Sequence, residues 1–385
     1  DEIQMEKRLF TSECVTKGHP DKVADAISDG ILDACLAQDP GSRVACETMV
    51  TTDRVIICGE ITTKANVNYE QVARDVIRSI GYTMNDEGFC ADTAAVECHI
   101  HTQSADIALG TNDEVGGAGD QGMMFGGACN ETPEKMPLSA ALSRALVNRL
   151  TACIAENPGL RPDGKTQVSV AYDENGKITG IDTVVVSVMH REDYTVEQVR
   201  SYVHDNVIAP VLAQYGFKVE DVEHIYINPT GKFVIGGPNG DTGLTGRKII
   251  VDTYGGYFPH GGGAFSGKDP TKVDRSAAYM ARYLAKNLVD AGLADKVQIQ
   301  LAYAIGVAEP VSVRVDSFGT GKISDEAMTD LLRKTCDLTP GGIIRRLDLR
   351  RPIYSATARD GHFGVAGYPW ERDDLAQDLK KLAGL

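Results

Sequence analysis

The sequence has 385 residues, of which 42% are hydrophobic and 24% charged, as in a soluble globular protein of two or three domains. No apolar run approaches the roughly 18 residues of a transmembrane helix, and a net charge of −15 argues against broad nucleic-acid binding, which needs a basic face. Asp1 to Arg8 lacks the apolar core of a secretory signal. Nine scattered cysteines without a Cys-x-x-Cys pair fit a reducing compartment, so we expect a cytoplasmic protein with mostly buried thiols.

Hydrophobic periodicity predicts the same unit of two helices and two strands three times. The first copy has a helix from Pro20, strands near 43–52 and 55–62, and a helix near 68–80 that Gly81 ends. The second has a helix near 138–156, a hairpin of 166–172 and 177–190, and a helix after the capping box Thr195–Gln198. The third has a helix near 270–290 from Asp269-Pro270, strands near 297–305 and 311–316, and a helix near 324–336.

This repetition indicates an α+β fold of three similar domains related by pseudo-threefold symmetry, each a mixed sheet covered on one face by helices. A sheet of this kind leaves its other face free to pack on something else. We expect these boundaries, with domains that need not be continuous in sequence: an N-terminal domain at 6–104, a mobile active-site loop at 105–119, a central domain at 120–236 and a C-terminal domain at 237–376.

Residues 228–275 combine glycines with cations. Gly231 to Gly267 contains 12 glycines, where average usage predicts roughly three. Glycine lets backbone N–H groups approach a ligand closely, and the interleaved cations suit an extended polyphosphate. These cations are Lys232, Arg247, Lys248, Lys268 and Lys272. The region therefore predicts a site for a large, highly charged nucleotide, with a loop-rich surface as the alternative.

Two helix starts extend this prediction. Gly18-His19-Pro20-Asp21-Lys22 opens the first helix, where unpaired N–H groups favour anions, and Asp21 could hold Mg²⁺ beside a phosphate; a simple helix cap is the alternative. Near the third domain's first helix, Asp269 is the expected cap and Asp274 a second metal carboxylate. The spacing is not that of a P-loop.

Glu47 and Glu60 lie on adjacent predicted strands, where they are either solvated or line a cation or amino-acid pocket. No Ser-His-Asp or Cys-His arrangement is evident. A reaction that needs little acid–base chemistry fits best, because such a site works by positioning and by stabilising charge on a leaving phosphate chain.

Ordered motifs from about Phe10 to Trp370 resemble the S-adenosylmethionine synthetase (methionine adenosyltransferase) family. They are Phe-Thr-Ser-Glu at 10–13, Gly-His-Pro-Asp-Lys at 18–22, Ala-Cys-Glu-Thr at 45–48, Gly-Glu-Ile-Thr-Thr at 59–63, Gly-Ala-Gly-Asp-Gln-Gly at 117–122, Gly-Leu-Thr-Gly-Arg-Lys at 243–248, Gly-Gly-Gly-Ala-Phe-Ser-Gly-Lys-Asp at 261–269 and Gly-His-Phe-Gly at 361–364. The resemblance implies that the methionine sulfur attacks C5′ of ATP, and that the displaced triphosphate is hydrolysed to phosphate and diphosphate.

The resemblance also implies residue roles. The catalytic residues would be His19, Lys165, Arg247 and Lys268. ATP would be bound by His19, Asp120, Asp163, Lys165, Lys232, Phe233, Asp241, Arg247, Lys248, Ala264 and Lys268, with Phe233 stacked on adenine. Methionine would be bound by Glu60, Gln103, Asp241 and Lys272. Two Mg²⁺ ions would be held by Asp21 and Asp274, and K⁺ by Glu47.

The resemblance further implies a homodimer with shared active sites, which assembles into a homotetramer as a dimer of dimers. The resemblance places Asp241, Ala264 and Lys268 on one subunit, and His19, Glu60, Gln103 and Lys165 on the other. Two residues depart from the family pattern: Lys232 stands where many members have Arg, and Ala105 replaces a usual Pro. The competing functions are a kinase-like phosphotransferase and a non-catalytic nucleotide-sensing module.

Overall fold

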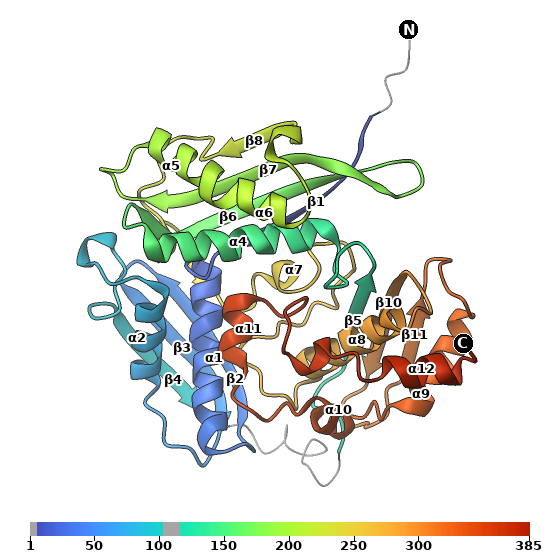
Figure 1. Cartoon of the computed structure of the whole chain (residues 1–385). Helices are drawn as coiled ribbons and strands as arrows, with labels where there is room; N and C mark the ends of the chain where they lie inside the picture. Colours follow the sequence, from blue (N-terminus) through green and yellow to red (C-terminus); the bar gives the residue numbers. More distant parts are fainter. Residues whose placement is uncertain (1–5, 103–115) are drawn as a thin grey trace.

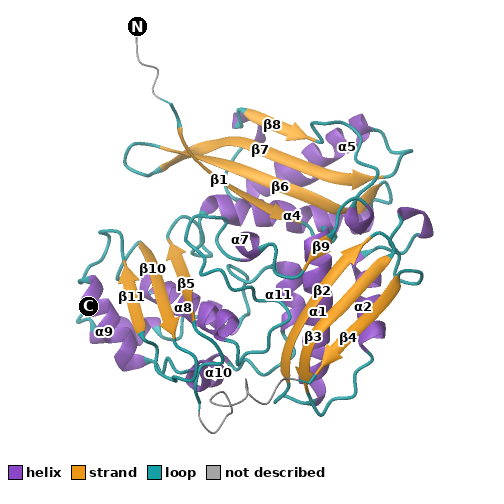
Figure 2. Cartoon of the chain, turned by 180° about the vertical axis from the view of Figure 1, so that it is seen from behind, coloured by secondary structure: helices purple, strands orange, loops and turns teal. Residues whose placement is uncertain are grey.

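The computed structural model describes residues 6–102 and 116–385 (Figure 1). Gln103 and most of the expected 105–119 loop lie outside these residues. The fold is α+β, with three sheets placed around the centre of the molecule and helices behind each of them (Figure 2). The three-domain α+β class predicted from the repeated pattern is therefore confirmed.

Each sheet takes strands from more than one part of the chain. The first sheet has the order β4 (Ala95–His101), β3 (Arg54–Thr62), β2 (Arg43–Thr51), β9 (Gly243–Leu244). The second has the order β1 (Arg8–Val15), β6 (Leu160–Tyr172), β7 (Ile178–His190), β8 (His224–Ile227). The third has the order β11 (Ser312–Asp316), β10 (Lys296–Tyr303), β5 (Gly122–Cys129). The first two sheets are mixed, because β3 and β4 and also β7 and β8 are parallel, whereas the third sheet is antiparallel.

The strand exchange means that the sheets do not follow the expected boundaries. β1 pairs with β6 of the central sheet, β5 pairs with β10 of the C-terminal sheet, and β9 pairs with β2 of the N-terminal sheet. Periodicity shows that a segment is a strand, but its partner is chosen by long-range edge pairing, which the local pattern does not report. The domains are thus discontinuous in sequence.

One long helix lies against each sheet. The first sheet is covered by α1 (Pro20–Gln38) and α2 (Tyr69–Ile80), and the second by α4 (Leu138–Glu156), α5 (Val196–Val203) and α6 (Ala209–Gln214). The third is covered by α8 (Val273–Asp290) and α9 (Asp325–Thr335). The remaining α-helices within residues 6–102 and 116–385 are α7 (Ile249–Asp252), α10 (Pro340–Leu347), α11 (Tyr354–Asp360) and α12 (Ala376–Leu382). The N- and C-terminal domains share one hydrophobic core, in which α11 packs on α1, and the central domain has its own.

Several local predictions are confirmed. α1 begins at Pro20, Gly81 ends α2 in the left-handed conformation, and the Thr195–Gln198 capping box is formed. Seven of the nine cysteines are buried, and all nine are free thiols.

The predicted start of α8 is wrong. The helix begins at Val273, because the Asp269 carboxylate accepts the Val44 N–H at 2.7 Å and the Thr271 N–H at 3.0 Å instead of capping the helix.

The close packing of β5 on α8 gives a stability prediction. A Cβ at Gly126 would lie 2.1 Å from the backbone carbon of Ala281, whereas a Cβ at Gly180 in β7 would meet nothing within 4 Å. Gly126→Ala should therefore destabilise the protein by about 2 kcal/mol through overpacking, and Gly180→Ala should be close to neutral. Thermal unfolding of both variants measures this, and equal melting temperatures would contradict the packing described.

Candidate functional site

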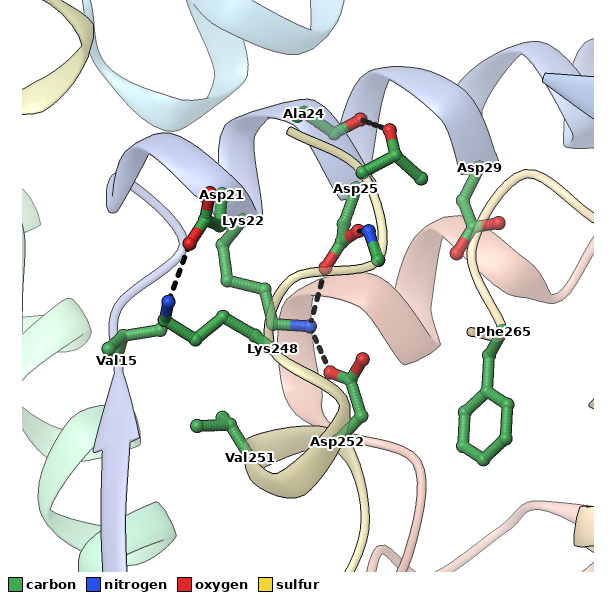
Figure 3. Close-up of polar contacts among 12 residues, drawn as sticks. Val15, Asp21, Lys22, Ala24, Asp25, Asp29, Lys248, Val251, Asp252 and Phe265 are labelled. Carbon is green, nitrogen blue, oxygen red and sulfur yellow. Dashed lines mark hydrogen bonds and ion pairs between the residues drawn. The ribbon is translucent and has the colours of Figure 1, made fainter. Parts of the chain in front are cut away.

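Four aspartates along α1 share one spacing, and each accepts backbone N–H groups from a distant part of the chain. Asp21, Asp25, Asp29 and Asp33 recur every fourth residue, which places them along one side of the helix. The Leu244 N–H donates to Asp21 at 3.0 Å, the Gly246 N–H to Asp25 at 2.9 Å and the Gly267 N–H to Asp29 at 2.8 Å. Asp33 accepts the N–H groups of Tyr354 and Ser355. We call these four residues the α1 acidic stripe (Figure 3 labels the first three).

The first three stripe residues hold the glycine-rich segment predicted to bind polyphosphate. Gly246 directly precedes Arg247 and Lys248, and Gly267 directly precedes Lys268. The Arg247-Lys248 pair and Lys268 are therefore each attached to α1 through the glycine that precedes them. A glycine is required at both positions, because φ is +81° at Gly246 and at Gly267, a backbone conformation that other residues rarely adopt.

One set of predicted residues gathers at the N-terminus of α1, and we call it the α1 group: His19, Asp21, Lys165, Asp241, Arg247 and Lys248. Lys248 Nζ lies 2.5 Å from Asp21 Oδ2, and Arg247 Nε lies 3.9 Å from Asp21 Oδ1 (Figure 3 shows the lysine contact). Burial works to raise the pKa of Asp21, but the hydrogen bonds from Lys248 and the Leu244 N–H outweigh it and hold the pKa below its usual value. Asp21 is thus a carboxylate paired with a cation.

His19 is a neutral donor at neutral pH. Its Nδ1 accepts the Asp21 N–H at 3.1 Å, so this side chain caps α1 and the ring proton of the neutral form lies on Nε2. Burial, followed by the nearby Lys248 and Lys165 charges, lowers the pKa of His19 to about 4, although Asp21 and Asp241 oppose the shift. His19 therefore forms the helix cap that the sequence analysis gave as the alternative. This cap lies at the same place as the expected anion site, the N-terminus of α1.

Asp163 is a buried carboxyl on β6. Its side chain is 7% exposed and accepts the Gly237 N–H at 2.8 Å, which ties the central sheet to the turn after Phe233. Burial raises the pKa of Asp163 to about 6. Lys165, two residues further along β6, is exposed, with its Nζ 3.7 Å from Glu13.

A second set of predicted residues, the α8 group, comprises Glu47, Glu60, Lys268, Lys272 and Asp274. Lys268 Nζ lies 2.9 Å from Asp274 Oδ2 in the first turn of α8, and Lys272 Nζ lies 2.6 Å from Asp269. Neighbouring protein atoms remove water from the Glu47 carboxyl and raise its pKa; Glu60 adds to this rise and Lys268 opposes it. The pairing of β2 with β3 places Glu47 and Glu60 on the outer face of the first sheet.

Ala264 lies between the two groups. A Cβ added at Gly246 would come within 2.7 Å of the Ala264 Cβ. Asp120 is exposed, and Gly119 beside it faces Thr271, just before α8. Within the chain, Asp241 lies near His19, and both Glu60 and Lys268 lie near Glu47.

Phe233 and Lys232 lie on the segment that follows β8. The backbone of Phe233 forms two hydrogen bonds with His190, both at 2.9 Å. Its N–H donates to the ring atom Nε2 of His190, and its carbonyl accepts the backbone N–H of His190. Lys232 is exposed and 3.6 Å from Glu192. Sequence reasoning missed His190, Asp25 and Asp29; only the four-residue spacing of the aspartates signalled the stripe.

The carboxylates fit the expected cations. Among the residues that the structure describes, no three or more His, Cys, Asp or Glu side chains form a complete metal site. Mg²⁺ in nucleotide enzymes is held by one or two carboxylates together with substrate phosphates, which is the arrangement Asp21 and Asp274 offer beside the lysines. Glu47 gives a single, partly desolvated carboxylate on which a monovalent cation would offset the charge.

The fold and the site together define a three-domain α+β protein in which a glycine-rich, cation-bearing segment is hydrogen-bonded to one helix. Three family models match the chain: the S-adenosylmethionine synthetase N-terminal domain at 7–105, the central domain at 115–233 and the C-terminal domain at 235–372. The chain therefore belongs to the S-adenosylmethionine synthetase family, whose members are enzymes of S-adenosylmethionine synthesis. None of the helices in 6–102 and 116–385 has the length and apolar character needed to cross a bilayer.

The lowered pKa of His19 predicts a pH dependence of stability. Between its unfolded value near 6.5 and its folded value of about 4, the unfolded chain binds more protons. His19 therefore costs the folded state stability as the pH falls through this window and has no such effect above it. Denaturation of wild type and His19→Gln from pH 8 to 4 should show the larger loss below pH 6.5 in wild type. Other groups, Asp163 included, cancel in this comparison, and parallel curves would contradict the shift.

Proposed function

We propose that this chain synthesises S-adenosylmethionine from ATP and L-methionine. The methionine sulfur attacks C5′ of ATP, the C5′–O bond breaks, and the electron pair of that bond leaves with the intact triphosphate. Water then cleaves the triphosphate to phosphate and diphosphate. Family membership supports the overall synthesis, and the geometry of the two groups supports the displacement of a triphosphate.

The pairing of lysines with carboxylates carries this proposal. Lys248 is paired with Asp21, and Lys268 with Asp274, so each cation expected on phosphate contacts a carboxylate expected on Mg²⁺. When the nucleotide binds, both lysines would turn to phosphate oxygens, and both carboxylates would become available to metal. The exchange keeps every charge paired and requires little backbone movement, because α1 already holds both segments.

The residues of the α1 group match a reaction without a general base. A thioether sulfur has no proton to lose, so the first step needs only charge stabilisation at the leaving oxygen. Neutral His19 presents Nε2–H as a hydrogen-bond donor, and Arg247 and Lys248 add positive charge beside it. Mg²⁺ at Asp21 and Asp274 would supply further charge neutralisation on the phosphates.

The remaining roles follow the family pattern. Phe233 would stack on adenine beside Lys232, while Asp120 and Ala264 would contact the adenosine part. Glu60, Gln103, Asp241 and Lys272 would orient methionine, and Glu47 would bind K⁺. Asp163 would act on ATP through the Gly237 turn that its buried carboxylate holds.

We further propose that two chains share each site, in a homodimer that assembles into a tetramer. Glu47 and Glu60 lie on an outer sheet face that no helix of the described chain covers (Figure 2). Two-fold contacts commonly bury such faces. His19 and Lys268 belong to different groups, which would let one group of each chain meet the other group of its partner.

Product analysis tests the proposed function. With ATP, methionine, Mg²⁺ and K⁺, the protein should form S-adenosylmethionine, phosphate and diphosphate in equal amounts, and no ADP. A kinase-like enzyme would release ADP, and a sensing module would bind ATP without turnover. Either of those results would overturn the proposal.

Lys268 should stabilise the departing triphosphate more than bound ATP, because negative charge develops there as the C5′–O bond breaks. We expect Lys268→Ala to lower kcat by about a hundredfold and to raise the Kd for ATP by a smaller factor. Lys334→Ala, which removes an exposed cation on α9, is the control. Single-turnover rates and equilibrium binding measure the two effects, and equal factors would indicate uniform binding instead.

Glu47 should make the activity respond to K⁺. Replacing Na⁺ by K⁺ at constant ionic strength should raise the wild-type rate, and Glu47→Gln should remove most of that activation. Glu97→Gln, on the neighbouring strand β4 and paired with Arg54, should respond to K⁺ as wild type does. A wild-type enzyme that is indifferent to K⁺ would refute the assignment.

The shared site predicts complementation between His19→Asn and Lys268→Ala. A mixed dimer of these inactive variants would contain one site with both residues intact. After random reassortment half of the dimers are mixed, so roughly a quarter of the wild-type activity should return. Exchange verified by mass spectrometry without any recovered activity would show that one chain supplies both residues to a site.

A further inference from the structure

The segment that carries Arg247 and Lys248 is fastened to α1 immediately before the two cations. The Leu244 N–H donates to Asp21, and the Gly246 N–H donates to Asp25 at 2.9 Å. Between them, the Thr245 hydroxyl donates to the Ala24 carbonyl at 3.2 Å. Three consecutive residues are thus bound to consecutive turns of one buried helix.

The same segment is fastened again after the cations. Lys22 Nζ forms an ion pair with Asp252, the last residue of α7, and lies 3.2 Å from Asp25 Oδ2 (Figure 3). Lys22, Asp25 and Asp252 are each at most 2% exposed. Burial works to lower the pKa of Lys22, but Asp252 and Asp25 outweigh it and keep the ammonium charged. One buried lysine therefore joins the two anchors on either side of Arg247 and Lys248.

We propose that Asp25 and Lys22 are positioning residues that hold the backbone of 246–252 so that Arg247 and Lys248 face the triphosphate. This inference rests on the proposed function and extends it to residues that contact no substrate. The Arg247 side chain is 56% exposed, so few neighbours fix its position. The direction in which it points therefore depends on the backbone at this residue. An error of about 1 Å in such a cation can cost about a hundredfold in rate.

The variant that tests the proposal is Asp25→Asn. The asparagine has nearly the same volume and can still accept the Gly246 N–H, but it offers no charge to Lys22. Asp33→Asn is the matched control, because Asp33 belongs to the same stripe and accepts two N–H groups, yet those belong to α11 and not to a cation-bearing segment.

Binding of inorganic tripolyphosphate with Mg²⁺ to the full-length protein, measured by calorimetry, is the main readout. We expect Asp25→Asn to weaken this binding by about tenfold, equivalent to about 1.4 kcal/mol, and to raise the KM for ATP while the KM for methionine stays within about twofold. Asp33→Asn should bind tripolyphosphate as wild type does, even where its melting temperature falls as far. Unchanged binding in folded Asp25→Asn would overturn the proposal.

Two further measurements decide the matter if Asp25→Asn does not fold. Thr245→Val removes, at constant shape, the hydroxyl that donates to the Ala24 carbonyl in the anchor before Arg247, and it should also weaken tripolyphosphate binding. In wild type, hydrogen exchange at Gly246 should be slow before any ligand is added, because the amide is already bound to Asp25. Exchange that slows only after tripolyphosphate binds would mean that the ligand, not Asp25, orders the segment.

These results separate the inference from the proposed function. If wild type produces S-adenosylmethionine and Asp25→Asn binds tripolyphosphate normally, only the positioning role fails. If wild type binds tripolyphosphate but forms no S-adenosylmethionine, only the proposed function fails.

Discussion

Carboxylates buried on a helix must receive hydrogen-bond donors or cations, and α1 carries three of them on one side, at Asp21, Asp25 and Asp29. The donors come from the glycine-rich segment of the C-terminal domain. The cations come from Lys248, Lys22 and Arg275, the last of which lies 2.7 Å from Asp29. The requirement to satisfy these groups therefore joins the helix of the first domain to the segment that we propose binds phosphate.

This arrangement separates two kinds of ion pair in one region. Lys22 and Arg275 are fully enclosed, and removing either would leave a buried carboxylate unpaired at a cost of about 3–5 kcal/mol. Lys248 and Lys268 are 18% and 22% exposed, so their pairs with Asp21 and Asp274 can open to a ligand. The enclosed pairs keep the backbone in place, and in the proposed function the accessible pairs exchange their partners for phosphate and metal.

The sequence predicted the elements more reliably than their partners. The start of α1, the extent of α4 and the Asn175-Gly176 turn follow from local periodicity and from residues with special backbone preferences. The exchange of β1, β5 and β9 between sheets depends on long-range pairing, which no local pattern encodes.

The site was predicted in the same uneven way. The cations were visible because glycines surround them, but acids spaced by four residues on a helix usually indicate a solvated face. Asp25 and Asp29 were therefore overlooked. Asp269 looked like a helix cap until the structure placed its carboxylate on Val44 and Thr271.

A crystal structure with Mg²⁺ and inorganic tripolyphosphate would test the central claim most directly. The account predicts that Lys248 and Lys268 leave Asp21 and Asp274 for phosphate oxygens, that metal takes their place on the carboxylates, and that the Gly246 and Gly267 N–H groups stay on Asp25 and Asp29. Lysines still paired with the aspartates beside a bound polyphosphate, or a glycine-rich segment released from α1, would contradict it.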